Sequence, residues 1–100
     1  MLGYHADAIR SVVDLDRRAT AVVNPEPERG MLSSWKWGLA SMAGADAVLV
    51  SPVDYPAIKS ETVSAVIDAI DDWDFAVPRH EGRHGHPICF RAAIIPEFLA

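Results

Sequence analysis

Short apolar runs alternate along this chain with longer segments whose apolar residues recur at helical spacing. The clearest run is Ala47–Val50, which lies between polar and proline positions and predicts a strand buried on both faces of a parallel sheet. The clearest helical stripe follows it and consists of Val63, Val66, Ile67, Ile70 and Trp73. The alternation is typical of an α/β domain in which helices flank a mostly parallel sheet.

Weaker patterns predict the remaining elements. Further helices are expected over residues 4–15, 33–43 and 92–99. Further strands are expected over residues 19–23, 75–77 and 88–90. Ser33 or Ser34 is the candidate N-cap of the second helix, and Ser60 is the candidate N-cap of the helix that carries the long stripe. The polar segment 79–87, RHEGRHGHP, is expected to be a loop.

Composition limits the chain to one small domain over residues 1–100. Half of the residues are hydrophobic and 23% are charged, which is the composition of a globular protein. The net charge of −5 comes without a basic cluster and argues against nucleic acid or a membrane surface as partner. The single cysteine, Cys89, excludes an internal disulfide and is expected to be buried and inert in its apolar run. No signal peptide or membrane span is visible, so we expect a cytoplasmic protein.

Asp54 is the first candidate site residue, because it follows the predicted central strand between Pro52 and Pro56. Proline cannot donate to a central ladder, so the chain must leave the sheet here and Asp54 must lie beyond the carboxyl end of the strand. Ligands of open α/β sheets bind at that end. A turn residue is the common role of such an aspartate. The functional alternative is a ligand of Mg²⁺ beside substrate phosphates.

A second candidate is the loop from Asn24 to Ser34, which contains Gly30, Ser33 and Ser34. The glycine permits close backbone approach to a ligand, and the serine hydroxyls can read a flat hydrogen-bonding surface such as a base. The structural alternative is a glycine turn followed by a serine cap.

The third candidate is the loop with His80, His84 and His86. Zinc is disfavoured there, because Arg79 and Arg83 would repel a cation and four well-spaced ligands are not visible. We favour a loop whose arginines and histidines face a phosphate or carboxylate.

An acidic cluster at residues 71, 72 and 74 closes the long helix, where the macrodipole disfavours negative charge. A solvated acidic surface is the favoured interpretation of these aspartates, and a metal site is the alternative.

Three segments, in this order and spacing, resemble the MobA-like nucleotidyltransferases, in particular the branch of molybdenum cofactor cytidylyltransferase. They are NPEPERGMLSSWKWGL, ADAVLVSPVDYPAIKSETV and VPRHEGRHGHPICF. The resemblance implies a Rossmann-like α/β fold with a mostly parallel sheet. It also implies Mg²⁺-dependent transfer of a nucleotidyl group from CTP or GTP to a phosphorylated cofactor precursor such as molybdopterin, in molybdenum cofactor biosynthesis.

The resemblance also assigns roles to single residues. Gly30 and Ser34, with Ser33 beside them, match the segment that lies by the nucleotide base. Asp54 matches the catalytic aspartate that holds Mg²⁺ against the triphosphate. Gly85, His86 and Pro87 match the GHP turn on the acceptor side of the family's cleft. Arg83 lies just before this turn and belongs to the same acceptor-side loop.

The chain departs from the family pattern in two places. It contains no glycine-rich loop of the type LAAGxSxRMG and no further acidic metal-binding position near its end. We therefore expect either a fragment of a longer protein or a chain completed by a partner or by a second copy, as a homo-oligomer. The alternative function is a non-catalytic binding or assembly module that has lost NTP binding. The sequence does not choose between CTP and GTP and does not fix the acceptor.

Overall fold

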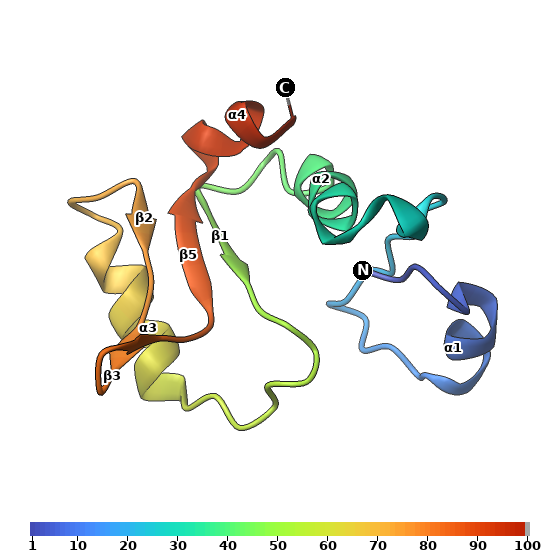
Figure 1. The fold of residues 1–100 in the computed structure, drawn as a ribbon, viewed down its shortest axis with the longest axis horizontal. Coiled ribbons are helices and arrows are strands. Elements are labelled where there is room, and N and C mark those ends of the chain that lie inside the picture. The colour runs from blue at the N-terminus through green and yellow to red at the C-terminus, as the bar shows by residue number, and fades with distance from the viewer. Residues whose placement is uncertain (100) are drawn as a thin grey trace. The chain divides into compact units, whose positions relative to one another are not determined.

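The computed structural model describes residues 1–99 and divides into two compact units (Figure 1). The first unit consists of residues Met1–Ala43 together with Leu99, and the second contains residues Gly44–Phe98. None of the helices in this described part of the chain has the length and apolar character needed to cross a membrane.

The first unit contains three helical elements. These are α1 (Ala6–Val12), the 3-10 turn η1 (Pro27–Arg29) and α2 (Met31–Ala40). The predicted strand over residues 19–23 is reduced to one parallel bridge between Leu2 and Val23. The predicted helix over residues 4–15 is shorter than expected. Its apolar stripe stays exposed, with Val12 82% accessible, so little packing energy supports a longer helix.

The second unit contains the sheets. Its strands are β1 (Ala47–Val50), β2 (Phe75–Ala76), β3 (Arg79–His80), β4 (Arg83–His84) and β5 (Ile88–Arg91). Its helical elements are α3 (Ser60–Ala69), the 3-10 turn η2 (Ala92–Ile94) and α4 (Ile95–Leu99).

The larger sheet has the order β1-β5-β2, and both of its pairings are antiparallel. The expected mostly parallel sheet is therefore wrong for the described strands. Because β1 and β2 are each antiparallel to β5, they run in the same direction on its two sides. β1 is an edge strand, in which Val48 is buried but Leu49 is 39% exposed, so the expected burial on both faces is also wrong.

The core of the second unit lies between α3 and β5. Val66 and Ile70 of α3 pack with Cys89, which is fully buried. Phe90 is also fully buried, and its ring contacts Phe75 and Phe98 at centroid distances of 6.2 and 5.2 Å. The amphipathic stripe predicted for this helix is thus correct at Val66 and Ile70.

Two members of the stripe predicted for α3 are exposed. Ile67 is 43% exposed and Trp73, just beyond the helix, is 68% exposed. Arg91 of β5 closes this end of the helix. Its guanidinium donates to the carbonyl oxygens of Ile70 and Trp73 at 3.1 and 3.2 Å, and to that of Asp71 at 2.5 Å. These bonds satisfy carbonyl groups that the helix end leaves without partners and fix the turn that leads into β2.

Two helices have N-cap residues other than those that the sequence predicts. Gly30 is the N-cap of α2, whereas Ser33 and Ser34 lie inside the helix. Lys59 is the N-cap of α3, so Ser60 is its first helical residue. Neither N-cap makes a side-chain hydrogen bond of the capping type.

Candidate functional site

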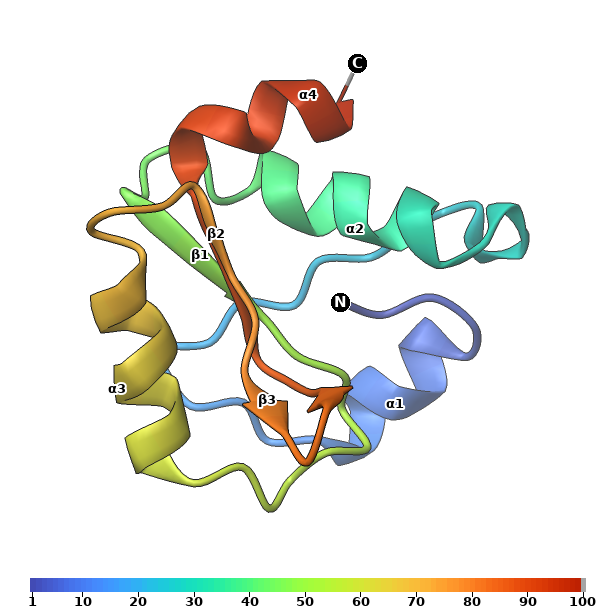
Figure 2. The same ribbon diagram turned by 60° about the vertical axis from the view of Figure 1, so that its left-hand side comes forward.

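Polar groups of the second unit gather at the carboxyl ends of β1 and β2. The loop 51–59 follows β1, the β3–β4 hairpin follows β2, and residues 85–87 lead into the antiparallel β5 at the same end. Figures 1 and 2 both show this hairpin and the first turn of α3 at one end of the unit. The carboxyl ends of β1 and β2, on either side of β5, therefore lie at one edge of the sheet.

Asp54 lies in the turn that follows β1, as the sequence predicts. The backbone N–H of Tyr55 donates to the carbonyl oxygen of Pro52 at 3.3 Å and closes this turn. The Asp54 side chain is exposed, and its carboxylate has no hydrogen bond or ion pair among residues 1–99. The self-bonded turn role of this aspartate therefore finds no support in the geometry, and both carboxylate oxygens are available to a cation.

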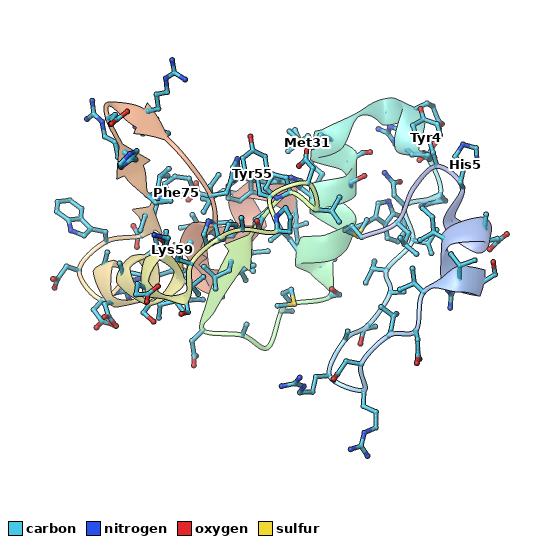
Figure 3. All side chains as sticks on the ribbon, turned by 90° about the horizontal axis from the view of Figure 1, so that it is seen from below. Tyr4, His5, Met31, Tyr55, Lys59 and Phe75 are labelled. Carbon is cyan, nitrogen blue, oxygen red and sulfur yellow. The ribbon has the colours of Figure 1, made fainter. Side chains whose placement is uncertain are left out.

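The GHP segment is held against the loop that carries Asp54. The rings of Tyr55 and His86 lie 5.1 Å apart at a tilt of 58°, and Figure 3 shows Tyr55 on this loop. Gly85 donates its backbone N–H to the carbonyl oxygen of Pro78 at 2.8 Å, Pro87 is buried and the His86–Pro87 peptide bond is cis. The structure thus brings together the candidate metal loop and the candidate acceptor-side turn.

His86 has one ring nitrogen, Nδ1, that is buried and has no hydrogen-bond partner among the described residues.

The segment predicted to be a loop contains the β3–β4 hairpin. Its two central residues, Glu81 and Gly82, have positive φ angles of 49° and 79°, which is the conformation of a type I′ turn. The register pairs Arg79 with His84 and His80 with Arg83. Because side chains alternate along a strand, the hairpin carries one arginine and one histidine on each face.

An open groove of about 1220 Å³ runs between the first half of α3 and this hairpin. Its charged and polar lining comprises Lys59, Glu61, Arg79, His80, Glu81, Arg83, His84 and His86. Figure 3 shows Lys59 at the start of α3. Basic side chains, histidines and two carboxylates thus share this lining, and the anion-facing interpretation of the histidine loop stays a prediction.

The candidate base-reading segment lies in the first unit and is organised by Asn24, which is 1% exposed. Its amide Nδ2 donates to the hydroxyls of Ser33 and Ser34 at 2.8 and 3.0 Å, and its Oδ1 accepts the backbone N–H of Glu26 at 2.9 Å. The Ser33 hydroxyl itself donates a hydrogen bond to the carbonyl oxygen of Gly30 at 2.8 Å. The Ser34 hydroxyl donates to no group that the structure describes, so it is able to donate a hydrogen bond to a ligand.

Gly30 connects η1 to α2 with φ 93° and ψ 176°. This backbone conformation is open to glycine and strained for other residues. A Cβ atom built on Gly30 would meet no atom within 4 Å, so the glycine is needed for its backbone angles and leaves open space in front of the helix.

Cys89 does not belong to the site. It is fully buried in β5, and this burial raises the pKa of its thiol, which suits packing rather than nucleophilic attack. Residues 1–99 also contain no group of three or more His, Cys, Asp or Glu side chains placed to hold a metal ion. Neither the histidine loop nor the acidic cluster after α3 forms such a group within these residues.

Sequence reasoning missed three residues. The sequence predicts that Asn24 is part of a proline turn. The only indication of its hydrogen-bond partners is the pair of serines nine and ten positions later in the chain. Lys59 precedes a predicted helix and shows no motif of its own. Arg91 has no sequence signal, because its carbonyl partners lie about twenty residues earlier in the chain.

These observations define a mixed domain of helices and small antiparallel sheets, with an unengaged carboxylate and a cationic groove at one end of the larger sheet. A family model described as the MobA-like NTP transferase domain matches residues 4–100. The match spans nearly the whole chain, and the protein therefore belongs to this family, as the sequence resemblance indicates. A search of curated proteins found no match.

Proposed function

We propose that this protein transfers a nucleotidyl group from CTP or GTP to a phosphorylated cofactor precursor such as molybdopterin, in molybdenum cofactor biosynthesis. Membership of the MobA-like NTP transferase family supports the reaction class. The observation that carries the proposal is the exposed, unengaged Asp54 at the same end of the sheet as the cationic groove. The family match runs through both compact units, which supports treating residues 1–100 as one domain with a Rossmann-like origin.

Asp54 is the residue that would hold Mg²⁺ in this reaction. A single free carboxylate fits this ion, because Mg²⁺ keeps several waters and takes one or two protein carboxylates together with substrate phosphates. When bound, Mg²⁺ supplies neutralisation of the charge that develops on the phosphates.

Other residues bind and orient the substrates. The open backbone at Gly30 and the hydroxyls of Ser33 and Ser34 would contact the base, with Ser34 as the hydrogen-bond donor. Arg83 and the Gly85-His86-Pro87 turn would orient the acceptor. An oxygen of the acceptor phosphate attacks the α-phosphorus, the bond to the β-phosphate breaks, and pyrophosphate leaves.

Calorimetric titration of the chain with CTP and with GTP, with and without Mg²⁺, tests the proposal. Asp54→Asn removes the carboxylate charge at nearly constant size, and Asp72→Asn is the matched control at an exposed carboxylate that is not assigned to the site. We expect saturable, Mg²⁺-dependent binding that Asp54→Asn weakens at least about tenfold and Asp72→Asn leaves unchanged. Absence of nucleotide binding by the folded chain would refute the proposal and favour the non-catalytic binding or assembly module.

A further inference from the structure

The loop 51–59, which carries Asp54, is held by few interactions among the described residues. Within the loop, one backbone hydrogen bond, from the N–H of Tyr55 to the carbonyl oxygen of Pro52 at 3.3 Å, closes the turn. Pro52 and Ile58 are partly buried near its two ends, whereas every residue between them is exposed. The Asp54 carboxylate has no anchor of its own, so its position depends on its neighbours in the chain.

Tyr55 connects this loop to the acceptor-side turn. Its ring centroid lies 5.1 Å from that of His86, and the two rings are tilted by 58°. Among the hydrogen bonds, ion pairs and ring contacts within residues 1–99, this contact is the one that joins a side chain of the loop to another segment. Tyr55 directly follows Asp54 in the chain, so the contact acts one residue away from the carboxylate.

His86 is a well-held partner for the Tyr55 ring. On one side of it, the N–H of Gly85 donates to the carbonyl oxygen of Pro78 at 2.8 Å, and on the other side Pro87 is buried and leads directly into β5. The imidazole forms no hydrogen bond within residues 1–99, and its Nδ1 is buried, so packing holds the ring. A side chain that packs on this turn is therefore tied to the sheet of the second unit.

We propose that Tyr55 is a positioning residue, which holds the Asp54 carboxylate in place for a divalent cation by packing its ring against His86. The inference rests on the proposed function in naming the cation as Mg²⁺. Tilted aromatic pairs are a favoured arrangement, and such a pair raises the population of the held loop conformation by a factor of about two to ten. The Tyr55 hydroxyl has no hydrogen-bond partner within residues 1–99, so the ring and not the hydroxyl has this role.

Titration with CTP at a fixed Mg²⁺ concentration compares two variants of Tyr55 with the unmodified chain. Tyr55→Leu removes the ring and should raise the Kd about three- to tenfold, whereas Tyr55→Phe keeps the ring and should leave the Kd within about twofold. Phe75→Leu is the matched control, because Phe75 is a similarly exposed aromatic residue whose ring stacks on Phe90 rather than on a residue of the site. Circular dichroism shows whether each variant is folded.

The same titration in the Asp54→Asn background separates positioning from direct contact with the ligand. A positioning residue acts through Asp54, so Tyr55→Leu should have no further effect once the carboxylate is gone. An effect of full size in that background would overturn the proposal, because the Tyr55 ring would then contact the nucleotide itself. Equal Kd values for Tyr55→Leu and the unmodified chain would also overturn it.

Mn²⁺ in place of Mg²⁺ tests the role of Tyr55 without nucleotide or turnover. Bound Mn²⁺ broadens the NMR signals of nearby protons, so an ion held at Asp54 should broaden the ring signals of His86, and Asp54→Asn should remove the broadening. At equal Mn²⁺ occupancy, Tyr55→Leu should reduce the broadening and Tyr55→Phe should preserve it. If Tyr55→Leu does not fold, His86→Leu removes the same contact, and the ring signals of Tyr55 then report on the ion.

The outcomes of the Mn²⁺ experiment separate this proposal from the proposed function. Absence of broadening in the unmodified chain, or equal broadening in Tyr55→Leu, would overturn the role of Tyr55. The expected pattern in a folded chain that binds no nucleotide would refute the proposed function and leave the role of Tyr55 intact.

Discussion

Replacement of Asn24 by alanine tests how the candidate base-reading segment is held. The variant loses the two bonds from Nδ2 to Ser33 and Ser34 and the bond from the Glu26 N–H to Oδ1. Each neutral hydrogen bond contributes roughly 1 kcal/mol net, so the three together contribute about 3 kcal/mol to the free energy of unfolding. Water can reach the exposed Glu26 and offset part of that loss, which leaves an expected cost of about 2–3 kcal/mol.

Urea denaturation followed by tryptophan fluorescence measures this cost, because Trp35 and Trp37 lie on α2. With a urea slope of about 1–2 kcal/mol per molar for a chain of this size, the transition midpoint should fall by roughly 1–3 M. Ser41→Ala is the matched control. It removes an exposed hydroxyl whose one bond, 2.6 Å to the carbonyl oxygen of Gly38, is local to the end of α2.

Two further variants separate the hydrogen bonds from the packing of Asn24. Asn24→Asp keeps the size and the Oδ1 acceptor but removes the donors and buries a charge, so it should destabilise at least as much as alanine at pH 7. A double-mutant cycle of Asn24→Ala with Ser34→Ala should give a coupling energy of about 0.5–1.5 kcal/mol. A midpoint for Asn24→Ala equal to that of Ser41→Ala, or a coupling energy near zero, would refute the role of Asn24.

Three other substitutions test the conformations described above. Gly30→Ala should destabilise by about 1–3 kcal/mol because of its positive φ, whereas Gly44→Ala, which also enters open space but needs no positive φ, should be neutral or slightly stabilising in the same urea assay. Arg91→Ala should lower the free energy of unfolding by about 1–2 kcal/mol, and Arg91→Lys by an intermediate amount, because a lysine ammonium group lacks the planar guanidinium that reaches several carbonyl oxygens at once. Equal stability of the two variants and the unmodified chain would contradict this role of Arg91. The pKa of the Cys89 thiol is raised in the folded state, so stability should be lost as pH rises above about 8.5, where the unfolded thiol ionises, and Cys89→Ala should show a smaller loss than the unmodified chain between pH 8 and 10.

Local sequence signals located most elements of the second unit. The apolar run at Ala47–Val50, the helix that begins at Ser60 and the short strand after Trp73 are all present. Proline and stripe patterns act over a few residues, and such signals can be read from the chain alone. The position of Asp54 in a turn beyond β1 follows from the same local reasoning.

Features set by distant residues were not predicted. The direction of β5 relative to β1 depends on pairing Val48 with Phe90, and the sequence contains no sign of it. The β3–β4 hairpin was missed because its strands have two residues each and its turn places Glu81, rather than asparagine or aspartate, at a positive φ. Ser33 and Ser34 were wrong as caps of α2 because the helix already begins at Met31, and Asn24 donates to both hydroxyls.

The proposed reaction is tested most directly by pyrophosphate release. The folded chain is incubated with Mg²⁺, CTP and molybdopterin, and the release of pyrophosphate is compared with reactions that lack the acceptor or contain Asp54→Asn. The account predicts acceptor-dependent release that Asp54→Asn reduces at least about a hundredfold, about 2.7 kcal/mol of transition-state stabilisation. A chain that binds nucleotide and acceptor but releases no pyrophosphate, or an Asp54→Asn variant with unchanged release, would contradict it.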